Sequence, residues 1–271
     1  MPELPEVETT LRGLAPYLKG RVIRELMVRQ RRLRQPIPPA TETQVAGQRI
    51  LELRRRGKYL LFDLERGSLL IHLGMSGSLR LVPLGTPART HDHVDLVMAD
   101  GHCVRFHDPR RFGLFLWLAE RPDAHPLLRQ LGPEPLEPGF DGAYLYQRSR
   151  GRKLPIKSLI MDAKVVVGVG NIYASEALFM AAIRPDQPAG QVDEIGCERI
   201  AQAIRQVLTE SISAGGTSVR DFVREDGQPG YYARRLRVYA RAQEPCVNCG
   251  TRLERTRIGQ RSSFYCPRCQ Q

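Results

Sequence analysis

Apolar residues follow a helical spacing in the first twenty positions of the chain. The residues that repeat three and four positions apart are Val7, Leu11, Leu14 and Leu18. Pro5 lies in the first turn of this run. A proline is tolerated there because a backbone N–H in the first turn has no helical partner in any case. The pattern predicts a helix from Leu4 to about Lys19.

Short runs in which apolar and polar residues alternate occupy the next hundred positions. Turn signals such as residues 63–67 and 100–101 separate these runs. The predicted strands are residues 22–23, 50–53, 59–64, 69–73, 78–81, 93–98, 104–106 and 114–118. Many short strands with hairpin-like punctuation indicate an antiparallel β-sandwich.

Residues 132–139 are rich in proline and glycine, and they interrupt this pattern as an interdomain linker does. Beyond them the apolar spacing becomes helical, over residues 156–161, 175–182 and 193–214. We therefore expect an α+β protein, in which an N-terminal helix and an antiparallel β-sandwich precede a helical domain. The predicted parts are a β-sandwich domain at 1–131, the linker at 132–139, a helical domain at 140–236 and a four-cysteine tail at 237–271.

Composition adds a charge argument to this picture. The chain has 271 residues, of which 42% are apolar and 26% charged, as in an ordinary globular protein. Its formal net charge is +12, a balance that favours polyanionic partners, chiefly nucleic acid. The alternative is a soluble protein that happens to be basic, and charge alone leaves both readings open.

No segment approaches the roughly 18 apolar residues needed to span a membrane. The first residues are acidic and proline-rich, whereas a secretory signal has a basic start and an apolar run, so we expect a cytosolic protein. Of six cysteines, Cys103 and Cys197 stand alone in apolar surroundings and the other four gather at the C-terminus. This distribution favours reduced thiols and a metal site over a disulfide framework.

The C-terminal cysteines form two pairs, Cys246 with Cys249 and Cys266 with Cys269, separated by sixteen residues. Two Cys-x-x-Cys pairs place four thiolates around a tetrahedral ion, which predicts one zinc ion. With four protein ligands the site has no open position, so the zinc is expected to be structural. Two reactive thiol pairs are the alternative. The segment between the pairs is a predicted β-hairpin rich in arginine, including Arg261.

The N-terminus offers a second candidate chemistry. Loss of Met1 would expose the secondary amine of Pro2, and an α-amino group titrates near 8, so part of it is neutral at physiological pH. A neutral amine attacks an electrophilic carbon, and the positive end of the following helix lowers the amine pKa further. Glu3 and Glu6 then stand beside the nucleophile as candidate acid–base groups. An ordinary helix start explains the same residues equally simply.

Several loops combine cations with glycine or with apolar tips. The basic turn 54–59 is a candidate phosphate contact or a solvated charge run. Met75, at the tip of a Gly-Met-Ser-Gly turn, either packs inward or wedges into a base stack, and 108–113 pairs cations with an aromatic residue in the same way. The His-Asp-His run at 91–93 is a phosphate contact or plain surface rather than a metal site. The glycines of 168–170 allow a phosphate to approach, with Asn171 as a candidate helix cap.

Taken together, these segments resemble the formamidopyrimidine-DNA glycosylase family, bacterial enzymes that remove oxidised purines from DNA. The matching segments are Pro2–Glu8, Gly57–Leu60, His72–Gly77, Asp108–Gly113, Gly168–Glu176 and Cys246–Cys269. They occur in the order of the family and span essentially the whole chain, so their combination is far more specific than any one of them.

The resemblance implies catalytic roles for particular residues. Pro2 would attack C1′ of the damaged nucleotide and hold the sugar as a Schiff base, while Glu3, with Glu6 beside it, protonates the opening sugar ring. Lys58 would assist the β-elimination that cuts on the 3′ side, and Arg261 the δ-elimination on the 5′ side. These steps make the implied enzyme a DNA glycosylase with AP lyase activity. Lys157 matches a family lysine near the lesion.

The resemblance also implies how the protein would hold duplex DNA. A base inside the duplex must be extruded before the enzyme can reach it, and Met75, Arg110 and Phe112 would fill the gap, with Arg110 facing the orphaned cytosine. His91 and Asn171 match family DNA contacts, and Asn171 belongs to a helix–two-turns–helix unit. Arg152 stands where the family often has lysine, which keeps the charge and changes its shape. Residues 221–232 resemble the family's lid over the lesion.

The expected protein is therefore a monomeric base-excision repair enzyme for duplex DNA with oxidised purines, such as 8-oxoguanine and formamidopyrimidines, in the bacterial cytoplasm near the nucleoid. One alternative is an endonuclease VIII-like glycosylase for oxidised pyrimidines, which normally lacks the set of Met75, Arg110 and Phe112. Another is a non-catalytic, zinc-containing binder of damaged DNA, which has no need of an exposed proline amine.

Overall fold

The computed structural model describes residues 2–217 and 232–271 of the chain. The chain forms two compact units, each made of two chain segments. The first, which we call the β-unit, comprises residues 1–129 and 214–233. The second, the helical unit, comprises residues 130–213 and 234–271. The predicted lid at 221–232 lies outside the described residues, except for Tyr232.

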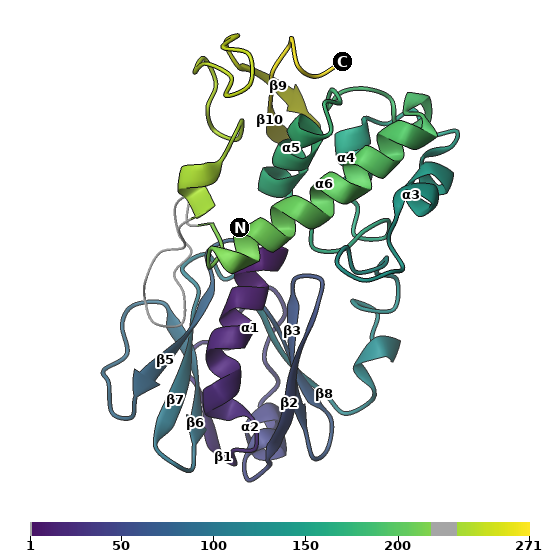
Figure 1. The fold of residues 1–271 in the computed structure, drawn as a ribbon. Helices are drawn as coiled ribbons and strands as arrows, with labels where there is room; N and C mark the ends of the chain where they lie inside the picture. Colours follow the sequence, from purple (N-terminus) through teal and green to yellow (C-terminus); the bar gives the residue numbers. More distant parts are fainter. Residues whose placement is uncertain (1, 218–231) are drawn as a thin grey trace. The chain divides into compact units, whose positions relative to one another are not determined.

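Two antiparallel four-stranded sheets make up most of the β-unit (Figure 1). One sheet has the strand order β1-β6-β7-β5 and the other β2-β3-β4-β8. The strands are β1 (Ile23–Val28), β2 (Ile50–Arg56), β3 (Tyr59–Leu64), β4 (Ser68–His72), β5 (Ser78–Pro83), β6 (Asp92–Met98), β7 (His102–His107) and β8 (Leu114–Leu118). The predicted antiparallel β architecture is confirmed, since every neighbouring pair of strands in the two sheets is antiparallel.

Helix α1 (Leu4–Leu18) shares its core with both sheets. Val7, Leu14 and Leu18 are buried in the same apolar cluster as Phe62 of β3 and Phe106 of β7. The predicted helix from Leu4 to about Lys19 is therefore confirmed, and its apolar stripe faces the sheets as the spacing requires. This packing fixes the N-terminus of α1, the end at which Pro2 and Glu3 stand.

The helical unit contains four α-helices and a two-stranded hairpin within its described residues (Figure 1). They are α3 (Gly142–Ser149), α4 (Ile156–Ile160), α5 (Asn171–Met180), α6 (Glu194–Ser213), β9 (Glu254–Ile258) and β10 (Arg261–Tyr265). The remaining short elements of the described chain are α2 (Ala40–Val45) and the 3-10 turns η1 (Pro122–Ala124), η2 (Ala189–Gln191) and η3 (Tyr232–Arg235). Among the described residues, none of the helices has both the length and the apolar character needed to cross a bilayer.

Helix α5 departs from the sequence prediction at its start. It begins at Asn171 and not at residue 175, because Gly170 supplies the extended N-cap. Asn171 is thus the first helical residue, and the expectation that it caps the helix was wrong. Every residue from Ile172 to Phe179 is buried, so the helix lacks the polar face by which an amphipathic pattern marks a helix start.

Candidate active site and metal centre

The first turn of α1 is held by a reciprocal cap. Glu3 is the N-cap residue, and its side chain accepts a hydrogen bond from the Glu6 backbone N–H. In return, Oε2 of Glu6 accepts the Glu3 backbone N–H at 2.7 Å. The second carboxylate oxygen of Glu6 accepts the Thr217 N–H, also at 2.7 Å. Both carboxylates are almost fully buried, with 2% of Glu3 and 1% of Glu6 exposed. Since both Glu6 oxygens hold backbone groups, the geometry favours a positioning role for Glu6.

Gly216 fits closely against this cap. Its φ angle is +83°, and a Cβ at this position would lie 3.3 Å from Oε1 of Glu6. A side chain would therefore meet both backbone strain and the carboxylate that holds Glu3. The glycine lets the chain after α6 approach the N-terminus of α1 within the β-unit.

Lys58 lies in the tight turn between β2 and β3, directly before the first residue of β3. Gly57, in the same turn, has a φ of +56°. Tyr59, the residue after Lys58, pairs with His72 across β3 and β4, and the two rings are 4.9 Å apart. Burial, together with the positive charges of Lys58 and Arg34, lowers the pKa of His72 to about 4. His72 is therefore neutral near pH 7, and its Nδ1 accepts the Gly74 N–H at 2.9 Å.

Asp108 joins the turn that carries Met75 to the loop that carries Phe112. It is fully buried, and its two oxygens accept the Ser76 hydroxyl at 3.2 Å and the Gly113 N–H at 2.8 Å. The two segments also touch, because a Cβ on Gly74 would lie 2.6 Å from the Gly113 nitrogen. Sequence reasoning gave Asp108 no role, although a carboxylate just before the Pro-Arg-Arg-Phe run is the visible signal.

The predicted wedge residues are exposed at these two loops. Met75 is 37% exposed and Phe112 47% exposed. The Arg110 guanidinium lies 5.2 Å from the centre of the Phe112 ring, a cation–π contact. The structure therefore brings Met75, Arg110 and Phe112 onto two linked loops of the β-unit.

His91 lies beside these loops. It is exposed and has a φ of +73°, and its carbonyl accepts the Asp108 N–H at 3.0 Å. Its ring meets the His107 ring edge-on at 6.1 Å. Among the described residues, the four cysteines are the group of three or more potential metal ligands whose ligand atoms converge, and residues 91–93 do not belong to it.

In the helical unit, two predicted residues hold the start of β10. Lys157 of α4 is 1% exposed, and its Nζ donates to the Ser263 hydroxyl at 2.7 Å and to the Ser262 carbonyl at 3.4 Å. The Asn171 side-chain amide donates to the same Ser262 carbonyl at 3.1 Å. Arg261, the first residue of β10, is exposed next to these anchors.

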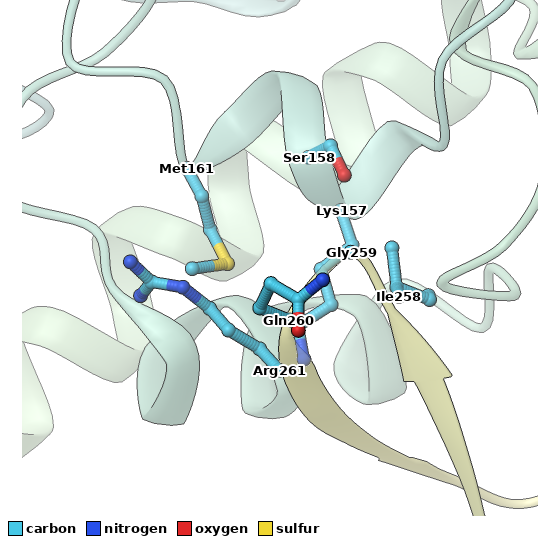
Figure 2. Close-up of a pocket in the computed structure, with 7 residues that line it drawn as sticks. All are labelled: Lys157, Ser158, Met161, Ile258, Gly259, Gln260 and Arg261. Atoms are coloured by element: carbon cyan, nitrogen blue, oxygen red, sulfur yellow. The ribbon is translucent and has the colours of Figure 1, made fainter.

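Figure 2 shows a pocket of about 220 Å³ between α4 and the turn of this hairpin. Lys157, Ser158 and Met161 line one side, and residues 258–261 line the other. The structure thus brings Lys157, Asn171 and Arg261 together around β10. Arg152, the remaining predicted contact of this unit, is exposed in the turn after α3.

The four C-terminal cysteines converge on one point. Their sulfur atoms all lie within 4.8 Å of one another, with Cys246 and Cys269 3.9 Å apart and Cys249 and Cys266 3.5 Å apart. Four sulfurs at about 2.3 Å from a tetrahedral zinc ion are separated by about 3.8 Å, close to these two spacings, and the cluster is compact enough to hold one ion. Four thiolates leave no open position, and the site is structural.

The other two thiols are unsuited to redox or metal chemistry. Cys103 and Cys197 are both buried. Burial raises the pKa of the Cys103 thiol to about 11, and it also raises the pKa of Cys197. Since only the thiolate is reactive, both residues behave as small apolar side chains.

Glu176 of α5 is a further buried carboxylate that sequence reasoning missed. Its oxygens accept the backbone N–H groups of Arg237, Val238 and Tyr239 at 2.8 to 2.9 Å. Burial raises its pKa despite these hydrogen bonds. A lone glutamate within an apolar helical run was the available signal, because such a charge is buried only when the fold supplies donors.

Comparison with known proteins agrees with this geometry. The formamidopyrimidine-DNA glycosylase N-terminal domain matches residues 1–115, and the H2TH domain of the same enzymes matches 131–223. A zinc finger found in FPG and IleRS matches 243–271. The chain belongs to the formamidopyrimidine-DNA glycosylase family. The predicted helix–two-turns–helix unit and zinc finger are thereby confirmed.

Individual relatives share the whole length of the chain. The formamidopyrimidine-DNA glycosylase of Acidithiobacillus ferrooxidans is 56% identical over 270 residues, covering 100% of both chains. The crystal structure of the MutM (FPG) protein of Thermus thermophilus is 39% identical with a TM-score of 0.89, covering 99% of this chain and 98% of that one. A variant Lactococcus lactis FPG bound to Fapy-dG-containing DNA is 31% identical with a TM-score of 0.92, covering 100% of both.

Proposed function

We propose that the protein is a base-excision repair enzyme that removes oxidised purines, such as 8-oxoguanine and formamidopyrimidines, from duplex DNA and then cleaves the abasic strand. The observation that carries this proposal is the capped N-terminus of α1, where Pro2 precedes Glu3 and Glu6 in a chain that is 56% identical to a formamidopyrimidine-DNA glycosylase. A non-catalytic DNA binder has no need of an exposed proline amine.

The glycosylase step uses the amine of Pro2 after Met1 has been removed. The nitrogen lone pair attacks C1′ of the damaged nucleotide, and the bond to the base breaks with its electron pair leaving on the base, which takes up a proton. The N-terminus of α1 lowers the amine pKa and favours the neutral nucleophile. Glu3 protonates the ring oxygen of the sugar as the ring opens to the Schiff base, while Glu6 holds the Glu3 backbone in place.

The lyase steps follow from the Schiff base, which acidifies the neighbouring C2′ proton. Loss of that proton expels the 3′ phosphate by β-elimination, a step that Lys58 assists by stabilising phosphate charge. A second elimination expels the 5′ phosphate, and Arg261 assists this δ-elimination. Lys157 and Asn171 support it indirectly, because they hold the strand on which Arg261 stands.

DNA binding involves both units of the chain. An extruded nucleotide leaves a gap in the duplex, and Met75, Arg110 and Phe112 fill it, with Arg110 facing the orphaned cytosine. Asp108 supports this set by linking the two loops that carry it. His91, Arg152 and Asn171 contact backbone phosphates. Zinc held by the four cysteines fixes the hairpin that presents Arg261.

The remaining expectations belong to the same proposal. We infer a division into a catalytic β-sandwich domain at 1–131, a linker at 132–139, a DNA-binding domain at 140–236 and the zinc finger at 237–271, which the family matches support in outline. We also infer a monomer that acts in the bacterial cytoplasm near the nucleoid, with residues 221–232 as the lid over the lesion.

Borohydride trapping on a duplex with 8-oxoguanine opposite cytosine tests this function. The expected result is a covalent protein–DNA adduct that peptide mapping assigns to Pro2, and that Pro2→Gly largely abolishes. A protein that binds the duplex without forming an adduct would be the non-catalytic binder. Stronger trapping on a thymine glycol duplex than on the 8-oxoguanine duplex would favour the endonuclease VIII-like alternative. A barely detectable adduct on the purine lesion would favour the same alternative.

A further inference from the structure

A second cavity, of about 380 Å³, lies in the β-unit beside the loops that carry Met75 and Arg110. The proposed reaction gives it no role. It is lined by Ser76, Ser78, Arg80, Arg89, His107, Pro109 and Arg110. This lining contains three arginines, a histidine and two hydroxyls, and it contains no carboxylate. Such a surface repels metal cations and attracts an anion.

One buried carboxylate contacts two of these side chains, Arg80 and His107, and the backbone of a third residue, Arg89. Asp92, at the start of β6, has 1% of its side chain exposed. Its oxygens accept the Arg80 guanidinium at 2.9 Å, the His107 Nδ1 at 2.8 Å and the Arg89 backbone N–H at 2.8 Å. The pocket wall is therefore preformed, because a single group fixes β5, the end of β7 and the loop before β6.

Asp92 remains charged in this position. Burial alone would raise its pKa, but the Arg89 N–H, the His107 hydrogen bond and the Arg80 charge more than compensate and lower it. One carboxylate cannot balance three arginines. Arg105 makes its closest ion pair with Asp95, at 2.8 Å, and lies 3.6 Å from Asp92. The excess positive charge of the lining is left for a ligand.

Within the described part of the chain, Arg80 has one guanidinium donor without a protein acceptor. Its Nη2 donates to Asp92, whereas its Nε is buried and has no hydrogen-bond partner among the described residues. A buried N–H without an acceptor is unfavourable, and native structures rarely leave one. An anionic oxygen that entered beside the guanidinium would supply that acceptor. Arginine forks with neighbouring hydroxyls suit phosphate oxygens in particular.

We propose that this pocket binds a backbone phosphate of the DNA, next to the point at which Met75 and Arg110 enter the duplex. The proposal rests on the proposed function for the identity of the polymer. Binding of this phosphate would fix the DNA backbone at the point where the duplex is opened. Met75 and Arg110 would then insert beside a strand that is already held in place. The lining offers no tyrosine, phenylalanine or tryptophan face on which a free nucleotide base could stack.

A scan with neutral methylphosphonate linkages tests the pocket. Each linkage within a few positions of an 8-oxoguanine·cytosine pair is neutralised in turn on either strand, and binding is measured for the wild type, Arg89→Gln and Arg66→Gln. Arg89 is exposed, so its replacement preserves the fold, and Arg66 is a matched exposed arginine in the turn 64–67 of the same unit. Circular dichroism and thermal unfolding verify that all three proteins are equally folded.

The expected result is that Arg89→Gln weakens binding of the unmodified duplex about tenfold, while Arg66→Gln leaves it within twofold. One or two adjacent linkages should weaken the wild type when neutralised and have no further effect on Arg89→Gln. If no linkage shows this coupling, the proposal is overturned. Binding of inorganic phosphate by the DNA-free protein that is lost in Arg89→Gln, without any coupled linkage, would also overturn it, because the pocket would then hold a free anion.

The same measurements separate this proposal from the proposed function. A wild type that binds the lesion duplex without cutting it contradicts the repair activity, yet the linkage coupling still decides the phosphate pocket. A wild type that cuts the lesion and shows no coupling contradicts only the pocket.

Discussion

The Glu6 carboxylate accepts a hydrogen bond from the Thr217 amide at 2.7 Å, although 211 residues separate the two in the chain. The other oxygen of Glu6 holds the Glu3 amide at the same distance. A single buried group thus connects the N-terminus of α1 with the residues that follow α6. Because Pro2 immediately precedes Glu3, loss of either hydrogen bond to Glu6 should alter the position of the proposed nucleophile.

Replacing Glu6 tests the bridge. In Glu6→Gln one oxygen becomes an amide donor that faces an N–H, so one of the two backbone hydrogen bonds is lost and a buried donor is left unpaired. A cost of about 1–3 kcal/mol is expected, together with a fall in the rate of borohydride trapping of about tenfold or more. Urea unfolding and single-turnover trapping measure the two effects.

Glu120→Gln, an exposed position of the same unit, serves as the control and should behave as the wild type in both assays. If Glu6→Gln loses stability but traps DNA at the wild-type rate, the positioning role is wrong and the group is only structural.

The state of His72 predicts a pH dependence of stability. Its pKa is about 4 in the folded protein and about 6.5 in the unfolded chain. The unfolded chain therefore binds the proton first as the pH falls, so the contribution of neutral His72 is complete above pH 6.5 and is lost on going from 6.5 toward 4. At pH 5 this amounts to at most about 2 kcal/mol.

Denaturant unfolding of the wild type and His72→Gln at pH 7 and pH 5 measures the effect. Glutamine retains an acceptor for Gly74 and does not titrate, so the variant should lose less stability on acidification. Equal losses in both proteins would contradict the assignment of His72 as the titrating group.

Zinc should stabilise the β9–β10 hairpin and have little effect on the two sheets of the β-unit. Cys249→Ser removes one of four ligands, and we expect loss of bound zinc and of DNA affinity while the β-unit stays folded. Bound zinc is measured by metal analysis and DNA affinity by duplex binding. The fold of the β-unit is followed by the near-ultraviolet circular dichroism of Trp117 in β8. Cys197→Ala, in the same helical unit but away from the metal, is the control, and unchanged DNA affinity in Cys249→Ser would argue against a DNA-facing finger.

Binding should weaken steeply with salt. If Lys58, Arg89, Arg152 and Arg261 each neutralise one phosphate, the logarithm of the binding constant falls with the logarithm of salt with a slope of about −3.6. Fluorescence anisotropy across a salt series measures this slope. A flat profile would exclude phosphate clamping as the main source of affinity.

Local patterns predicted those features that depend on neighbouring residues. The apolar spacing of α1, the short apolar runs of β3 and β4, and the cysteine pairs each follow from a short stretch of sequence, and the structure agrees with them. The start of α5 did not follow in this way. Its residues are buried on all sides, so no polar face marked where the helix begins.

Features that join distant segments could not be read from the sequence. The contact of Glu6 with Thr217, the link between Ser76 and Asp108 and the neutral state of His72 all depend on tertiary packing. Asp92 shows the same limit, since a histidine-flanked aspartate gives no sign of the three partners that it orients. The resemblance supplied candidate residues, whereas the packing explains how they are held.

The composition of the β-unit has a consequence for synthesis of the protein. Its sheets belong to residues 1–129, but the partner of Glu6 belongs to the second segment, 214–233, which is made only after most of the helical unit. At translation rates of 5–20 residues per second, roughly 4 to 17 s pass between the two. During that interval the nascent chain already carries its amine, while the cap that orients it is incomplete. The proposed nucleophile is therefore held in its final position only after residues 214–233 have been synthesised.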